Sequence, residues 1–102
     1  MNTGLLVIVR SGLDRRIYVR EAIDAALVCA AFDMQVSVLF EGDGTAFSRM
    51  PHFDQLFESG SPEDFVRIGI LAPALASAVH TETLSSDEAI KLIAAHQHIL
   101  VA

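Results

Sequence analysis

The chain contains one cysteine, Cys29, so any covalent sulfur chemistry it performs must use that thiol. A reactive cysteine needs an exposed thiolate with a pKa lowered by a nearby cation or by a helix N-terminus. Cys29 instead falls near the C-terminal end of a predicted helix, between Val28 and Phe32, where the helix dipole disfavours an anion. We therefore interpret it as a small apolar side chain in packing or in an interface, and we predict no catalytic residue.

Arginines form the second group with chemical potential. Four of the seven basic residues fall between positions 10 and 20: Arg10, Arg15, Arg16 and Arg20. Arg10, Arg15 and Arg16 occupy the loop after the first predicted strand and the start of the following helix, where open α/β sheets bind ligands. These three side chains predict a site for a phosphate, a sulfur oxyanion or an acidic patch on a partner. Arg20 lies one turn from Asp24, and a surface ion pair explains it more simply.

Histidine and glycine patterns do not indicate a bound group. The four histidines are His52, His80, His96 and His98, of which only the last two are close in sequence, with no cysteine nearby. Gly12 is isolated, and the chain has neither a dinucleotide fingerprint nor a phosphate loop. We therefore expect no metal and no cofactor.

The elements that position these side chains follow from the apolar pattern. Residues 4–9 form a continuous run rich in branched side chains, typical of a strand covered on both faces. Residues 16–33 predict a long helix and residues 35–41 a second strand, which together make a βαβ unit. The helix is apolar on nearly two faces, because Val28 and Phe32 form a second apolar stripe on a side that would otherwise face solvent. We expect this side to contact another helix, in this chain or in a partner.

Three phenylalanines, Phe47, Phe53 and Phe57, follow the Gly-Asp-Gly turn with few partners nearby in sequence. Two interpretations stay open for them. They form a lid over the sheet, or they join Val28 and Phe32 in a subunit interface, where aromatic residues are enriched.

The second half of the chain is less clear. Residues 65–71 fit a helix or a strand equally well, and residues 77–84 predict a strand with one polar face. Residues 85–88 form a capping box before a short helix at 89–96, and residues 98–102 predict a last strand.

These elements predict one α/β domain over residues 1–102, with three layers, a mostly parallel open sheet of about five strands and helices on both faces. The composition is 52% hydrophobic and the formal charge is −6, which argues against direct nucleic-acid binding. No apolar run is long enough for a membrane span, no signal peptide is evident, and a lone cysteine excludes an internal disulfide, so we expect a cytoplasmic protein. The apolar surplus favours a chain partly covered by other subunits.

Two sequence stretches resemble a known family. Residues 21–33 (EAIDAALVCAAFD) and residues 36–44 (VSVLFEGDG) are similar to the first helix and the following strand of DsrE/DsrF-like proteins. This family includes the subunits of the DsrEFH and TusBCD sulfur-relay complexes. The capped helix at 85–96 and the terminal strand add a second likeness, closest to the DsrF/TusC branch. The likeness extends over residues 4–44 and 78–102.

The resemblance implies a subunit of a mixed ring or dimer of trimers that passes sulfur between carrier proteins as a cysteine persulfide. The relay cysteine of the family follows the third strand, and residues 71–80 here contain none. The resemblance therefore implies a structural, non-catalytic subunit in a hetero-oligomer of related small α/β chains. The alternative is a stand-alone domain that binds a small molecule or an anion and forms a homo-oligomer.

Overall fold

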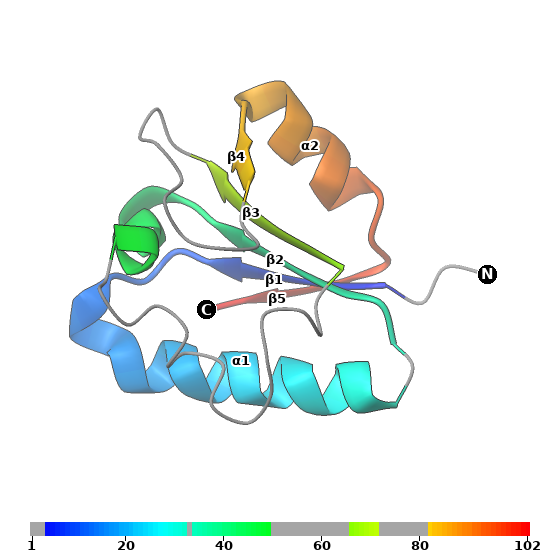
Figure 1. The fold of residues 1–102 in the computed structure, drawn as a ribbon, viewed down its shortest axis with the longest axis horizontal. Coiled ribbons are helices and arrows are strands. Elements are labelled where there is room, and N and C mark those ends of the chain that lie inside the picture. Colours follow the sequence, from blue (N-terminus) through cyan, green and yellow to red (C-terminus); the bar gives the residue numbers. More distant parts are fainter. Residues whose placement is uncertain (1–3, 33, 50–65, 72–81) are drawn as a thin grey trace.

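The computed structural model describes residues 4–32, 34–49, 66–71 and 82–102. Five parallel strands form one sheet in the order β4-β3-β2-β1-β5 (Figure 1). The strands are β1 (Leu5–Val9), β2 (Val36–Phe40), β3 (Arg67–Leu71), β4 (Glu82–Leu84) and β5 (His98–Val101), and the helices are α1 (Arg16–Ala31) and α2 (Ser86–Ala94). The predicted α/β fold is confirmed, and the described sheet is parallel throughout.

The two helices lie on opposite sides of the sheet, as Figure 1 shows. Alternate residues of β1 point to the two faces, so Val7 and Val9 meet α1 while Leu6 and Ile8 face α2. The α1 face is buried beneath Val19, Ile23, Ala26 and Leu27, and the α2 face beneath Ala89 and Leu92. This is the layering expected for an all-parallel sheet, whose strands need cover on both faces.

The ambiguous stretch at 65–71 contains strand β3, which pairs in parallel with β2 from Ser37↔Arg67 to Phe40↔Ile70. Its alternation decides the conformation: Ile68 and Ile70 enter the core on the α1 face, and Gly69 lies against Leu84. Of the strand expected at 77–84, the structure describes β4 alone.

The capping box before α2 is confirmed. The Ser85 hydroxyl accepts a hydrogen bond from the Glu88 N–H at 3.2 Å, and the Glu88 carboxylate accepts one from the Ser85 N–H at 3.0 Å. These bonds hold the pKa of Glu88 below its usual value. The helix ends at Ala94, two residues earlier than expected, and the His96 ring Nδ1 lies 2.7 Å from the Leu92 carbonyl oxygen.

A 3-10 helix, η2 (Gly42–Arg49), follows β2 and passes very close to β1. Gly42 adopts a left-handed conformation with φ 55°, and the Gly44 N–H donates to the Glu41 carbonyl at 2.9 Å. A Cβ on Gly44 would overlap the main-chain carbonyl of Val9. Glycine is required at 44 by close approach and at 42 by backbone conformation.

We expect Gly44→Ala to lower the free energy of unfolding by about 2 kcal/mol or more, because two main-chain segments must separate. Gly42→Ala is the matched control: a Cβ there meets nothing within 4 Å, so its cost is about 1 kcal/mol of backbone strain. Urea denaturation monitored by circular dichroism measures both. Equal losses in the two variants would contradict the close approach.

Candidate functional site

The predicted arginine site lies at the carboxyl ends of β1 and β5. From β1 the chain adds β2, β3 and β4 one after another on one side of β1. It then returns and adds β5 on the other side of β1, so the strand order reverses between β1 and β5. This is the topological switch point at which open α/β sheets bind ligands. The Arg10 and Ser11 N–H groups both donate to the Ala102 carbonyl, at 2.8 and 3.2 Å, and fix the loop to the end of β5.

Arg10 is engaged in an ion pair. Its Nε donates to the carboxylate of Glu41, the residue that follows β2. The Glu41 N–H in turn donates to the Val9 carbonyl at 3.0 Å, so the pair ties the ends of β1 and β2 together. With a carboxylate as partner, Arg10 offers little uncompensated positive charge to a ligand.

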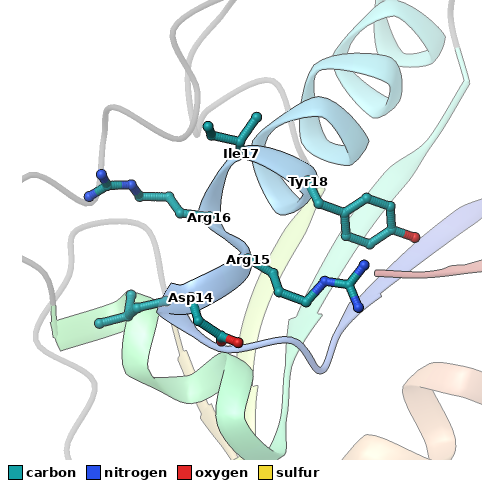
Figure 2. A pocket seen from close by; sticks show the side chains of 6 residues that line it. Asp14, Arg15, Arg16, Ile17 and Tyr18 are labelled. Atoms are coloured by element: carbon teal, nitrogen blue, oxygen red, sulfur yellow. The ribbon is translucent and has the colours of Figure 1, made fainter.

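Arg15 ends the 3-10 turn η1 (Leu13–Arg15) and is the N-cap of α1, whose first residue is Arg16. The Arg15 guanidinium lies 4.8 Å from the centroid of the Tyr18 ring, a cation–π contact. Figure 2 shows Arg15 directed toward Tyr18 and Arg16 directed away from it. The structure therefore does not bring the three predicted arginines together in one cluster.

A surface hollow of about 300 Å³ accompanies these residues. Its lining consists of Leu13, Asp14, Arg15, Arg16, Ile17 and Tyr18 (Figure 2). The first turn of α1 contains no acidic residue, and no side chain caps it. The two guanidinium groups and the positive end of the α1 dipole favour an anion, while the Asp14 carboxylate opposes one.

Cys29 lies in the last turns of α1, half-buried, with its side chain packed against the core on the α1 face. Its carbonyl accepts hydrogen bonds from the N–H groups of Phe32 and Met34, at 3.1 and 3.2 Å. The residue thus lies at the carbonyl end of the helix, away from its N-terminus.

The five aromatic and apolar residues predicted as an interface divide into three groups. Val28 and Phe32 are exposed at the end of α1. Phe47 is fully buried in this chain's own core, with its ring centroid 6.3 Å from that of Phe40, which leaves it nothing to offer a partner. Phe53 and Phe57 lie outside the described residues.

Ile17 is a further exposed apolar residue of α1 that was not among the residues predicted for an interface. Residues 17, 21, 25, 28 and 32 fall within about 80° of one another around the helix axis, and all five are exposed. We call this set the α1 stripe: Ile17, Glu21, Ala25, Val28 and Phe32. The exposed fractions of its three large apolar members are 75% for Ile17, 57% for Val28 and 83% for Phe32. In the sequence, Ile17, Val28 and Phe32 are separated by 11 and 4 residues, a spacing that places them on one side of a helix.

No group of three histidine, cysteine, aspartate or glutamate side chains that fits a metal ion occurs among the described residues. His96 and His98 diverge: His96 bonds the end of α2, and His98 begins β5. His52 and His80 are not among the described residues. Within the same part of the chain, neither helix is long and apolar enough for a membrane span.

A scan against protein-family models gives no match to this chain, and a comparison with curated proteins gives none either.

We expect the Cys29 thiol to react slowly with iodoacetamide in the folded protein, because half-burial against the core restricts access. The matched control places the only thiol on the neighbouring exposed position, as Val28→Cys in a Cys29→Ser background. Mass spectrometry over time should show several-fold faster labelling at position 28. Equal or faster labelling of Cys29 would contradict the packing described above.

Proposed function

We propose that this chain is a structural, non-catalytic subunit of a cytoplasmic sulfur-relay complex resembling DsrEFH or TusBCD. It docks onto related small α/β subunits through the α1 stripe. The sulfur-carrying thiol belongs to a partner subunit, and carrier proteins approach a surface that this chain helps to shape.

The exposed α1 stripe is the observation that carries this proposal. The opposite side of α1 is fully engaged with the sheet through Val19, Ile23 and Ala26, so the stripe is surplus to folding. Three large apolar side chains at these exposures are costly in water, and their burial contributes on the order of 5 kcal/mol. A contact surface explains why the helix has two apolar sides.

The charge within the stripe favours a related but different subunit over a second copy. Glu21 lies between Ile17 and Ala25, exposed among apolar neighbours. If two copies of α1 packed antiparallel about the middle of the stripe, Glu21 would face the partner's Val28 and would lose water without gaining a cation. A different subunit with a basic residue at that position satisfies the carboxylate and selects the partner.

The environment of Cys29 supports a non-catalytic role. The thiol packs into the α1-face core, whereas persulfide transfer needs a sulfur that a second protein can reach. Since Cys29 is the chain's only cysteine, a relay complex containing this chain needs a thiol from another subunit.

We expect Phe32→Glu to abolish co-purification of the partner subunits, because it places a charge in the most exposed apolar position of the stripe. Native mass spectrometry of tagged protein from its own host measures the assembly. Ile90→Glu, a substitution at an exposed apolar position of α2, is the matched control and should leave the complex intact. Cys29→Ser should assemble and leave sulfur transfer unchanged; a Cys29→Ser protein that assembles but no longer supports transfer would overturn the proposal.

The second candidate function is anion binding at the hollow beside η1, favoured by its place at the switch point and by Arg15 and Arg16. Sulfate titration followed by NMR should then shift the amides of residues 13–18 in a salt-sensitive manner. The Arg15→Ala/Arg16→Ala double variant should lose these shifts, and Lys91→Ala on α2 should retain them. Unchanged shifts in the double variant would exclude this site.

A further inference from the structure

Strand β5 is an edge of the described sheet, and its apolar side chains are partly exposed on both faces. It pairs with β1 and ends the sheet, while α1 packs on β1 and β2 and α2 packs on β3 and β4 (Figure 1). Its three apolar side chains remain exposed: Ile99 at 46%, Leu100 at 39% and Val101 at 48%. In the described part of the chain, no other strand is as apolar and as exposed.

The main chain of β5 directs alternate groups toward β1 and away from it, and no described strand pairs with the outward groups. The His98 N–H donates to the Gly4 carbonyl and the Ala102 N–H to the Ile8 carbonyl, at 3.2 and 2.8 Å. Residues 98, 100 and 102 therefore direct their N–H and C=O groups toward β1. Ile99 and Val101 direct theirs outward, where the natural complement is another strand and not a helix.

Nothing in the sequence of β5 protects this edge. Soluble proteins often protect edges with Asp, Glu, Lys or Arg, with proline or with bulges; residues 98–101 contain none of these residues, and their pairing with β1 has no bulge. The opposite edge is different: β4 has three residues, and its Glu82 carries a charge engaged by Arg67. The chain therefore protects one edge of its sheet and leaves the other open.

This asymmetry decides which strand fits β5. Pairing with β4 of another copy would set a charged strand against an apolar one and would extend head to tail without closing. Pairing with β5 of another copy is uncharged on both sides and closes after two chains.

The register of such a pair follows from the outward groups. With a two-fold axis at Leu100, Ile99 of one copy faces Val101 of the other, and the reverse, as two hydrogen-bonded pairs. The two Leu100 side chains then meet as a non-hydrogen-bonded pair on the α1 face, where side chains approach most closely. An axis at Ile99 would instead place Val101 opposite Gln97 and Leu100 opposite His98.

We propose that β5 is a homodimer contact, in which the β5 strands of two copies pair antiparallel about Leu100 and join two sheets into one. The contact uses a different surface from the α1 stripe and holds whether or not the chain belongs to a sulfur-relay complex. Its area is small, so the dimer forms reversibly and its population rises with chain concentration.

Disulfide trapping tests the register. In a Cys29→Ser background, Leu100→Cys should give a covalent dimer under mild oxidation, because its Cα lies within disulfide range of its own symmetry mate. Ile99→Cys faces Val101 and should cross-link much more slowly. Ile90→Cys on α2 reports random encounters and should cross-link no faster than Ile99→Cys. Preferential trapping through position 99, or equal rates for all three variants, would overturn the proposed register and contact.

A concentration series in light scattering tests the contact without new thiols. The wild-type mass should rise from 11.0 kDa toward twice that value, and Ile99→Lys should hold it at the single-chain mass. Circular dichroism of Ile99→Lys verifies that the fold persists. Phe32→Glu should dimerise like the wild type, which separates this contact from the α1 stripe. A wild-type mass independent of concentration at the single-chain value, or dimers lost in Phe32→Glu and kept in Ile99→Lys, would refute the β5 contact.

Discussion

The pairing of β1 with β2, buried on both faces, is the constraint on which the rest of this structure depends. From Leu6 to Val9 and from Val36 to Phe40 every residue is buried, so no side of these two strands tolerates water. A parallel pair also needs a connection that crosses a face of the sheet, and α1 provides both the connection and the cover. The second face needs α2, which the chain supplies only after β3 and β4.

Covering the centre with two helices leaves the periphery of the sheet exposed. α1 packs over β1 and β2, and α2 packs over β3 and β4, whereas β5 pairs with β1 at the edge of the described sheet and keeps its apolar side chains partly exposed. The outer side of α1 is exposed as well, and no described element packs against the α1 stripe. In the described part of the chain, the two helices thus bury the central strands and leave an edge strand and the α1 stripe exposed.

The elements with strong local patterns were predictable from the sequence. The apolar runs of β1 and β2, the length of α1 and the capping box at Ser85 and Glu88 depend on neighbouring residues, and the structure confirms them. The stretch at 65–71 was not decidable, because Ile68 and Ile70 acquire their strand alternation only through pairing with β2. The arginines were expected together because they are close in sequence. Arg10 turns instead to Glu41, 31 positions away, and no local pattern contains that contact.

Phenylalanine exposure shows the same limit more sharply. Phe32 follows an apolar stretch of the sequence and Phe47 follows a Gly-Thr-Ala stretch, yet Phe32 is 83% exposed and Phe47 is fully buried. The difference arises from tertiary structure. η2 packs at the ends of β1 and β2 and places Phe47 against Phe40, whereas Phe32 is the C-cap of α1 and its side chain is exposed. The sequence spacing identified apolar residues that could form an interface. Only the fold distinguishes Phe47, which is buried in the core, from Val28 and Phe32, which are exposed.

The two proposed contacts differ in what they can recognise, and the difference follows from their chemistry. The α1 stripe contains a carboxylate, Glu21, whose burial needs a cation from the other side, so it favours a partner of different sequence. The β5 edge is uncharged and repeats its own pattern about Leu100, so its best complement is itself. A chain with one surface of each kind can join unlike subunits through α1 and relate two such groups by a two-fold axis through β5. This arrangement stops at two copies of the chain, because the β5 edge of each copy is occupied once the two strands have paired. Neither copy then has an unpaired β5 edge to bind a third.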